Sequence, residues 1–256
     1  MHKKPYNFLR SVVTGLLFLG ILIYSQKLFR IDYHWDFGIL PGYFWQEGPG
    51  LLLKGLMNTL WISLLTILIG MILGLILTFA RRSRDKILRV ATVGCIEFIR
   101  GTPLLVQLYI AYFFIGTVLQ LQPLTAGVAS LSLFAACYFA EIFRAGIDSV
   151  APGEILAARS LGFKEHQIYR LIILPQAFSR ILPALLGQLT SIVKDSSLLS
   201  VIAITELAKA GREAVLDSFR SFEIWFVVAA IYLILNLFIF GIFYLCQIPA
   251  KTKARS

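Results

Sequence analysis

The sequence is poor in charge, cysteine and histidine. Only 15% of its 256 residues are charged, whereas a soluble domain of this length carries about 25%. The three cysteines, Cys95, Cys137 and Cys246, lie in or beside apolar stretches without metal-ligand spacing, and none of the three histidines lies inside an apolar run. An odd number of cysteines in this arrangement argues against a disulfide framework, and we predict no metal site.

Motifs for nucleotide binding and catalysis are also missing. No G-x-x-x-x-G-K-[ST] occurs, so this chain cannot cradle the phosphates of ATP by itself. No buried Ser/His arrangement or pair of carboxylates is in place for hydrolysis. We therefore predict no catalytic residue and no cofactor in this chain. The net charge of +10 would suggest nucleic acid in a soluble protein, but the apolar runs predict membrane lipid and no nucleic-acid partner.

Long apolar runs are the dominant feature of the sequence. Hydrophobic residues make up 58% of the chain and the mean hydropathy is +0.78, while one membrane crossing needs roughly 20 apolar residues. Four runs cover residues 11–28, 57–80 (with a start near Leu51), 175–202 and 224–248. The uncharged stretch Gly101–Ala140 is too long for one crossing, and the polar break Gln120–Pro123 divides it into two. The pattern predicts an all-α polytopic membrane protein with six transmembrane helices.

The run over 175–202 differs from the others because polar and helix-breaking residues interrupt it. The interruptions are Arg180, Pro183, Gly187 and the pair Lys194–Asp195. We predict an irregular or broken span there, and broken backbone at membrane depth is tolerated only if it is buried in protein or lines a cavity.

Lysine and arginine are unevenly distributed between the two sides of the predicted membrane. An even number of spans puts both termini on one side, and that side holds most of the Lys and Arg residues. Since cytoplasmic loops carry this excess, we predict that both termini are cytoplasmic. The opposite side would carry the loop 31–50, whose Trp and Tyr residues are typical of the headgroup level.

A short polar segment, Gly153–Gly162, lies between two apolar runs on the predicted cytoplasmic side. Pro152 and Gly153 are predicted to end the preceding helix, and Glu154 to lie in the first turn of a new one, where a negative charge suits the helix dipole. Ala157 and Ala158 favour helix, and Gly162 is predicted to end it. Small residues let another surface approach closely, so the segment is typical of a docking element; a plain interfacial loop is the alternative.

The order AARSLG followed by LIILPQA resembles the signature loop of ABC-importer permeases. Other stretches, in the same order along the chain, resemble the polar amino-acid subfamily of these permeases over about residues 51–247. They are LLLKGLMNTLWISLLTILIGMILGLIL (51–77), EFIRGTPLLVQL (97–108), YFAEIFRAGIDSV (138–150), SIVKDSSLLSVIAITEL (191–207) and SFEIWFVVAAIYLILN (221–236). The resemblance implies the five-helix core of a type I ABC importer, preceded here by one extra N-terminal helix.

The resemblance also implies an organisation and a set of partners. Residues 1–50 would be an N-terminal transmembrane helix and an outer aromatic loop, 51–248 the permease transmembrane domain with a coupling loop at 151–175, and 249–256 a basic cytoplasmic tail. The multi-pass chain would lie in a bacterial inner membrane with a dimer of ATP-binding subunits, a second permease subunit (identical or related) and an external solute-binding protein. ATP and Mg²⁺ would be bound by the partner ATPase.

In this family the signature loop forms the coupling helix, which inserts into a groove of the ATPase subunit. The residues to which the resemblance assigns this coupling are Glu154, Ala157, Ala158, Gly162 and Phe163. The family usually has Glu directly before the two alanines, where this chain has Leu156. Glu154 is two positions earlier, about 200° away around a helix. Either the docking salt bridge is absent or the start of the helix is shifted.

Ionisable groups within spans are costly and suggest functional roles. Glu97 and Arg100 are three residues apart and are predicted to pair on one helix face. Glu141 and Arg144 repeat this spacing, and we interpret both pairs as structural. Lys194 and Asp195 are adjacent, so they point to different faces and need other partners.

Polar and aromatic groups near the middle of the spans are candidates for substrate contact. They are Thr102, Gln107, Ser132, Phe134, Gln188, Ser191, Lys194 and Asp195. The resemblance aligns Gln188 and Phe134 with positions where relatives for basic or polar amino acids tend to carry Glu and Asn. A neutral Gln188 removes the counter-charge for a cationic side chain, which favours a neutral, or else an acidic, amino acid. For Phe134 ordinary packing is the alternative.

We interpret the chain as the permease subunit of an ATP-driven importer for a polar amino acid, with the mixed-charge loop 203–222 as the candidate contact for the binding protein. The alternative is a secondary amino-acid transporter that works without an ATPase partner. Such a transporter needs coupling-ion ligands near the middle of the membrane and often has an internal repeat, and neither is visible in the sequence.

Overall fold

The structure of the chain is a computed structural model. It describes residues 33–45 and 50–253, with side chains up to Phe243, and isolated positions between Val13 and Tyr24. The predicted first span, residues 11–28, and the predicted basic tail, 249–256, fall largely outside this description. The chain divides into two compact units, Met1–Gly38 and Ile39–Ser256, and the features described below lie in the second unit unless stated otherwise.

In the first unit, the described part of the outer loop is a small cluster of aromatic rings. The ring of Trp35 meets that of Tyr33 edge-on, with the centroids 5.3 Å apart, and stacks on that of Phe37 at 5.6 Å. The backbone N–H of Gly38 donates to Asp36 Oδ1 over 3.0 Å. The aromatic composition of this stretch therefore produces local ring packing.

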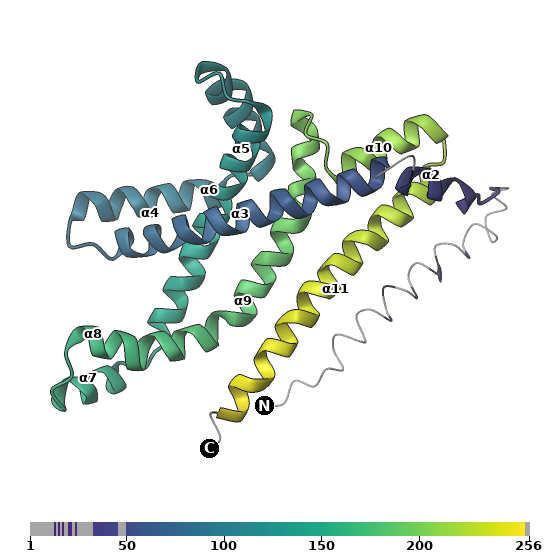
Figure 1. Ribbon diagram of the computed structural model, residues 1–256. Coiled ribbons are helices and arrows are strands. Elements are labelled where there is room, and N and C mark those ends of the chain that lie inside the picture. Colours follow the sequence, from purple (N-terminus) through teal and green to yellow (C-terminus); the bar gives the residue numbers. More distant parts are fainter. Residues whose placement is uncertain are drawn as a thin grey trace. The chain divides into compact units, whose positions relative to one another are not determined.

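The elements that the structure describes are all helices (Figure 1). In chain order they are η1 (Phe37–Ile39), α2 (Leu40–Phe44), α3 (Leu51–Arg81), α4 (Lys86–Gly101), α5 (Leu104–Tyr109), the π-helix η2 (Ile110–Gly116), α6 (Pro123–Asp148), α7 (Pro152–Ser160), α8 (Glu165–Ile168), the π-helix η3 (Tyr169–Ile173), α9 (Leu174–Asp195), the 3₁₀-helix η4 (Ser196–Ile202), α10 (Leu207–Ser218) and α11 (Ser221–Lys253).

Within the described residues, four helical stretches are long and apolar enough to cross a membrane. They are Leu51–Arg81, Pro123–Asp148, Glu165–Ile202 and Ser221–Phe243, and a fifth exists if α4 and the α5–η2 segment count as one bent span. The predicted start of the second span near Leu51 is confirmed. The polar break before Pro123 is also confirmed, since Pro123 begins α6.

The part of the chain between Gly101 and the break at Gln120 forms one helical stretch, α5–η2 (Leu104–Gly116), where we predicted one crossing. This stretch is too short to pass as a span alone; it does so only together with α4 before it, which it meets at an angle of 108°. Thr102 is extended (φ −115°, ψ 148°) between the end of α4 and Pro103. Proline has no N–H to continue a helix and disfavours helical backbone at the residue before it, so the chain changes direction at this point.

The predicted irregular or broken span over 175–202 is irregular but not broken. α9 runs as one helix from Leu174 to Asp195 with Pro183 inside it, and changes to the 3₁₀-helix η4 only at Ser196. An interior proline removes one helical hydrogen bond, a loss that membrane helices tolerate where neighbouring helices support them. Ile181 and Leu185 of α9 are buried against Phe139 and Phe143 of α6, and this packing holds the helix through the proline.

The core of the second unit is the contact between α3 and α6, where small residues bring the two backbones together. A Cβ added to Gly70 would lie 3.1 Å from Ala135 Cβ, and one added to Gly74 would lie 2.7 Å from Phe139 Cβ. Thr78 Oγ1 donates to the carbonyl oxygens of Gly74 (2.7 Å) and of Ala140 across the interface (3.3 Å). The sequence pattern GxxxG leaves open whether it marks a dimer face or internal packing; in this chain it is internal.

The predicted mixed-charge loop 203–222 is largely helical, which corrects the expectation of a loop. α10 buries Leu207, Ala210 and Ala214 in a cluster with Leu52 of α3 and Ile224 of α11. These buried residues recur every three to four positions, so α10 has one apolar face. That face packs against the spans although the stretch as a whole is polar.

Because α3 and α6 are in close contact at Gly74, we expect that even one added methyl group there destabilises the fold. Gly74→Ala should lower the free energy of unfolding by about 1 to 3 kcal/mol, because the new methyl group overlaps Phe139 Cβ and forces the helices apart. Gly94→Ala is the matched control, since nothing lies within 4 Å of a Cβ at Gly94 in α4. It should be neutral or stabilising by up to about 1 kcal/mol. Thermal unfolding of the purified variants in detergent measures both, and equal midpoints would contradict the packing described here.

Candidate functional site

The polar segment between the spans forms the helix α7 as predicted, but with a different start. Helix α6 already ends at Asp148, and Pro152 takes the first position of α7 after an extended Ala151 (φ −63°, ψ 128°). The prediction that Pro152 and Gly153 end the preceding helix was therefore wrong. Proline suits the first helical position because its missing N–H would have no partner there. Glu154 lies in the first turn, as predicted.

The end of α7 is a Schellman motif at Gly162, which confirms the predicted helix end. Gly162 has φ +81°, a conformation that glycine adopts without strain. Its N–H donates to the carbonyl oxygen of Arg159 over 3.0 Å, and the N–H of Phe163 donates to that of Ala158 over 3.1 Å. These two bonds are the ones that define the motif, so the backbone of the segment is locally fixed.

The two alanines of α7 point to different sides. Ala158 is 4% exposed and packs with Val150, Ile168 and Ile173, so it anchors the helix to the chain. Four exposed apolar residues lie in α7 and in the turn after it, and we call them the outer face of α7: Leu156 (59% exposed), Ala157, Leu161 (77%) and Phe163 (37%). Exposed apolar residues gathered on one surface mark an interaction site. Of the predicted pair, only Ala157 is available to a partner.

A chain of hydrogen bonds connects α7 to α9 and to the end of α6. Gln176 Nε2 donates to the carboxylate of Glu154, and Arg180 Nη2 donates to Gln176 Oε1 over 3.1 Å. Arg180 Nη1 donates to the carbonyl oxygen of Ser149. The carboxylate of Glu154 is thus bonded within the chain. Sequence reasoning missed Gln176 and Arg180, although their spacing of four residues on α9 is the signal for such a pair.

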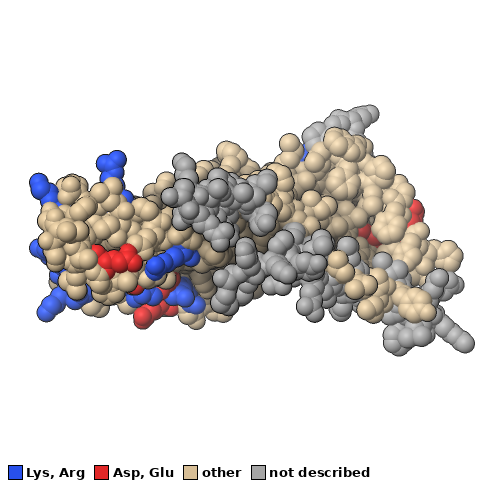
Figure 2. Space-filling view, turned by 90° about the horizontal axis from the view of Figure 1, so that it is seen from below, with Lys and Arg blue, Asp and Glu red and all other residues tan. Residues whose placement is uncertain are grey.

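Ionic side chains form a network at the end of the second unit that carries α7 and α8, the end at which Figure 2 shows most of the blue Lys and Arg side chains. Glu141 of α6 accepts from Arg81 of α3 and from Arg144 Nη2 at 2.8 Å. The predicted pair Glu141–Arg144 is therefore confirmed. Asp148 binds Arg82 at 2.8 Å and Arg144 at 3.1 Å.

Arg100 joins this network across helices, which corrects the predicted pair with Glu97. Its Nη1 lies 3.6 Å from Glu141 Oε2, and its guanidinium lies 5.2 Å from the ring centroid of Tyr138. Because α4 turns back along α3 and α6, its Arg100 finds a carboxylate on α6 that local spacing could not indicate. The network ties the ends of α3, α4 and α6 together.

Thr102 and Gln107, two predicted substrate contacts, are brought together at the bend between α4 and α5. Gln107 Nε2 donates to the carbonyl oxygen of Ile99 (2.6 Å) and to Thr102 Oγ1 (2.8 Å), while Thr102 Oγ1 lies 3.0 Å from the carbonyl oxygen of Phe98. The amide nitrogen of Gln107 therefore holds the free carbonyl end of α4. These bonds stabilise the bend.

The two predicted residues of α6 lie in different surroundings. Ser132 is fully buried, and its hydroxyl makes no hydrogen bond to any described residue. Phe134 is half-buried, packs between two apolar clusters and lies 4.8 Å, centroid to centroid, from Tyr138. These contacts support ordinary packing, and not substrate contact, as the role of Phe134.

Three of the remaining predicted residues, Gln188, Ser191 and Asp195, share one side of α9. They are half-buried at helical spacing, and Lys194 beside them is exposed. Among the described residues, none forms an ion pair with Lys194 or Asp195, and no hydrogen bond joins this group to Thr102 or Gln107. The candidates therefore lie in three places: at the bend, on α6 and along α9.

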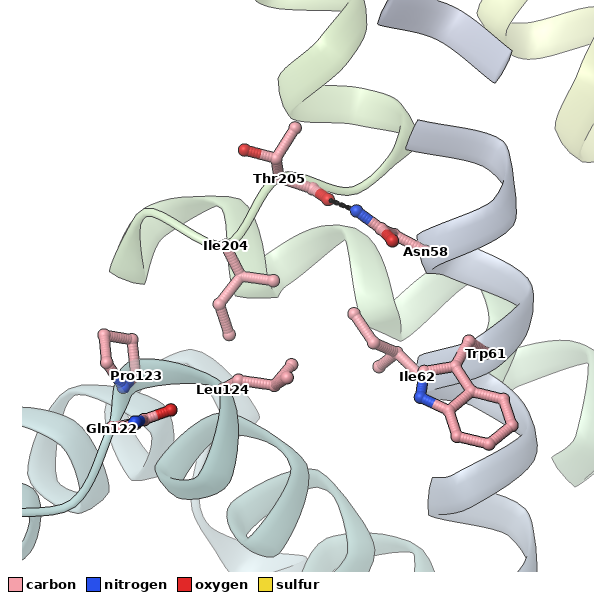
Figure 3. A pocket seen from close by; sticks show the side chains of 8 residues that line it. All are labelled: Asn58, Trp61, Ile62, Gln122, Pro123, Leu124, Ile204 and Thr205. Carbon is pink, nitrogen blue, oxygen red and sulfur yellow. Dashed lines mark hydrogen bonds between the residues drawn. The ribbon is translucent and has the colours of Figure 1, made fainter. Parts of the chain in front are cut away.

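A pocket of about 320 Å³ lies at the end of α6 opposite to α7 (Figure 3). Trp61 and Ile62 of α3 line one side of it, Gln122 to Leu124 another, and Ile204 and Thr205 the third. Asn58 Nδ2 donates to the carbonyl oxygen of Thr205 over 2.7 Å and joins α3 to this segment. Sequence reasoning did not select these residues, although an asparagine in an apolar helix is the kind of signal that marks such a position.

Glu206, beside this pocket segment, is a fully buried carboxylate. It caps α10 by accepting from the N–H groups of Ala208 and Lys209, both at 2.8 Å, and it accepts from Tyr232 Oη at 2.9 Å. Burial raises its pKa above the ordinary value of 4.5, and these hydrogen bonds oppose the rise only in part. It is therefore a structural cap and not part of an exposed charged surface.

Comparison with known proteins gives consistent matches. Residues 51–247 match the family described as binding-protein-dependent transport system inner membrane component. The glutamine transport system permease protein GlnP of Escherichia coli (strain K12) is 38% identical over 196 residues, covering 75% of this chain and 89% of that protein. The octopine transport system permease protein OccM of Rhizobium radiobacter is 34% identical over 218 residues, covering 81% and 88%.

A solved structure agrees with these relatives. The crystal structure of an amino acid ABC transporter with histidines matches with a TM-score of 0.77 and 34% identity, covering 84% of this chain and 99% of that chain. The range matched by the family equals the range over which the sequence resembles it. The fold of the second unit is therefore that of a known class of membrane transport protein.

The buried carboxylate of Glu206 predicts a specific pH dependence. A raised pKa means that the folded protein binds more protons than the unfolded one above pH 4.5, so stability falls as pH rises from there through the raised pKa. Glu206→Gln should remove this slope. The difference in thermal midpoint between wild type and Glu206→Gln, followed in detergent from pH 4.5 to 8, should favour the wild type most at the acid end.

Tyr232→Phe is the control for this measurement, because it removes one hydrogen bond but keeps the carboxylate. It should lower stability and retain the slope. Parallel profiles for wild type and Glu206→Gln would show that the carboxylate does not titrate differently in the folded protein.

Proposed function

Because the chain belongs to the family of binding-protein-dependent transport system inner membrane components, we propose that it is the permease subunit of an ATP-driven importer for a polar, neutral amino acid. An external binding protein delivers the amino acid, and a partner ATPase supplies the energy with bound ATP and Mg²⁺. The chain itself acts as a transport subunit and not as an enzyme. The observation that carries the proposal is the exposed outer face of α7 within a chain of this family.

The outer face of α7 suits an ATPase subunit as its partner. Leu156, Leu161 and Phe163 are apolar and exposed, and the Schellman motif fixes the turn that presents them. Through Glu154, Gln176 and Arg180, the same helix is hydrogen-bonded to α9. Movement of an ATPase seated on this face would therefore reach the spans directly. Leu156 in place of the family's usual Glu makes this contact apolar rather than ionic.

The remaining organisation follows from the same proposal. Residues 11–28 form a sixth span, so that both termini lie in the cytoplasm with α7, and a second permease subunit, identical or related, completes the pathway. The binding protein docks at the opposite end, near the pocket between Asn58 and Thr205. Domain boundaries at residues 50 and 248 separate the extra helix and the basic tail from the matched core.

Docking on α7 predicts that a charge on its outer face disrupts the complex. Leu161→Asp should weaken association with the ATPase about tenfold or more, because the carboxylate would be buried in an apolar contact. Leu161 is 77% exposed in the free chain, so folding of the permease should be unaffected. Co-purification of the ATPase and ATP-driven uptake in liposomes measure the effect.

Leu119→Asp is the matched control, since Leu119 is also exposed (61%) but lies in the turn after η2. It should leave ATPase binding unchanged. Full uptake by the Leu161→Asp variant, or uptake by the chain alone without ATP, would favour the secondary transporter instead.

A neutral cargo is supported by the chemistry of α9 and by the relatives. Gln188 is half-buried and makes no hydrogen bond to a described residue, and it lies on the same side of α9 as Ser191. An uncharged amide offers hydrogen bonds but no counter-charge for a cationic side chain. The Escherichia coli relative is a glutamine permease, and glutamine is neutral at its side chain. We place the amino acid along this side of α9, with Lys194 and Asp195 at one end.

Introducing a charge at Gln188 tests this placement. Gln188→Glu should shift the preference of the reconstituted importer from glutamine toward arginine and lysine by about tenfold, because the new carboxylate pairs with the cationic side chain. The ratio of uptake rates, measured with saturating binding proteins for each amino acid, gives the result. Gln188→Asn, which keeps the amide, should not produce this shift, and an unchanged ratio in Gln188→Glu would remove Gln188 from the pathway.

A further inference from the structure

A second pocket, of about 370 Å³, lies between the end of α4, the second half of α6 and the first half of α9. Three guanidinium groups line it, those of Arg100, Arg144 and Arg180, together with Glu141 and the ring of Tyr138. Apart from Ser149 and Gly146, the rest of its lining is aliphatic. A pocket of this size accommodates a small polar group, and its charged lining selects for an anion.

The charges around this pocket are not balanced. Arg81, Arg100 and Arg144 all converge on the single carboxylate of Glu141. Asp148 is shared by Arg82 and Arg144. The acceptors of Arg180 are the neutral oxygens of Ser149 and Gln176. Five guanidiniums thus share two carboxylates, which leaves three positive charges without a counterpart inside the cluster.

Arg100 has the largest unused capacity for hydrogen bonding in this cluster. Within the described part of the chain it makes no hydrogen bond, because its nearest carboxylate oxygen is 3.6 Å away. Its side chain is 39% exposed, and the Tyr138 ring beneath it holds the guanidinium in place by a cation–π contact. A planar guanidinium supported on one face presents its N–H groups at the edge, in the geometry that binds phosphate or carboxylate bidentately.

The surroundings of the pocket indicate a lipid as the source of the anion. α6 and α9 belong to candidate spans and α4 to the bent pair, so the pocket opens among helices that lie in or at the membrane. Guanidiniums next to aliphatic side chains such as Ile142 and Ile181 match a molecule with an anionic head beside acyl chains. Basic pockets between membrane helices bind anionic headgroups for this reason.

We propose that this pocket binds the phosphate group of an anionic phospholipid, with Arg100 as the principal ligand and Arg144 and Arg180 beside it. The bound phosphate neutralises part of the excess charge and links α4 to α6 and α9. This site is separate from the outer face of α7 and from the side of α9 that carries Gln188, so the proposal does not depend on which amino acid is transported.

Lipid retention by the full-length protein tests the proposal. The chain in detergent micelles is titrated with phosphatidylglycerol, with phosphatidylcholine as the zwitterionic control, and bound lipid is counted by native mass spectrometry. We expect phosphatidylglycerol to bind in preference to phosphatidylcholine. Arg100→Gln should weaken its binding about tenfold, the effect of one lost hydrogen-bonding charge. Arg84→Gln, which removes an exposed arginine outside the cluster, should bind as the wild type does.

A second variant and a second ligand distinguish loss of the site from loss of the fold. Arg100→Lys retains the charge and therefore the fold, but loses the planar fork, so it should still bind phosphatidylglycerol more weakly than the wild type. Equal retention by wild type and both Arg100 variants would overturn the site. A thermal shift with inorganic phosphate, but none with phosphatidylglycerol, would overturn the assignment to a lipid.

Discussion

The close approach of α3 to α6 is the contact on which the rest of the second unit depends. Between membrane helices the hydrophobic effect provides little attraction, so packing and polar contacts must hold them together. The glycines at 70 and 74 let the backbones meet, and Thr78 bonds across the interface one turn later. One further turn brings Arg81 to Glu141. Side chains at the glycines would separate this ion pair as well as the helices, so the packing and the ionic network depend on the same spacing.

α6 extends this constraint to α7, the helix that we propose as the contact for the ATPase. The chain passes from Asp148 of the ionic network to the start of α7 at Pro152 within a few residues. Ser149 in that connection accepts from Arg180 of α9. α7 is held a second time through Glu154 and Gln176. It is therefore attached to two helices at once, by the backbone to α6 and by side chains to α9. A short helix fixed in this way can transmit a displacement, whereas a flexible loop would absorb it.

The sequence predicts those features that depend on local chemistry. Apolar length located the span from Leu51, the proline at 123 marked the start of α6, and Gly162 marked the end of α7. It does not predict features that depend on the direction in which the helices run. The 108° bend at Thr102 and Pro103 leaves no mark in the hydropathy of the sequence. Local spacing paired Arg100 with Glu97, because the return of α4 toward α6, which brings Arg100 to Glu141, is visible only in the tertiary structure. Pro183 was one of several residues expected to make the span irregular or broken, yet packing against α6 keeps α9 continuous through it. The burial of Glu206 depends on the contact of α10 with α3 and α11.

The predicted substrate contacts separate into two kinds once their hydrogen bonds are known. The amide nitrogen of Gln107 is used at the bend, where it binds the backbone of Ile99 and the hydroxyl of Thr102. A group whose donors are satisfied within the chain can offer them to a cargo only by breaking the bend, which costs more than the new bond returns. The side chains of Gln188 and Ser191 make no hydrogen bond to a described residue. A polar side chain near the middle of a membrane helix needs a partner there, so we expect α9, and not the bend, to supply the contacts that a passing amino acid makes.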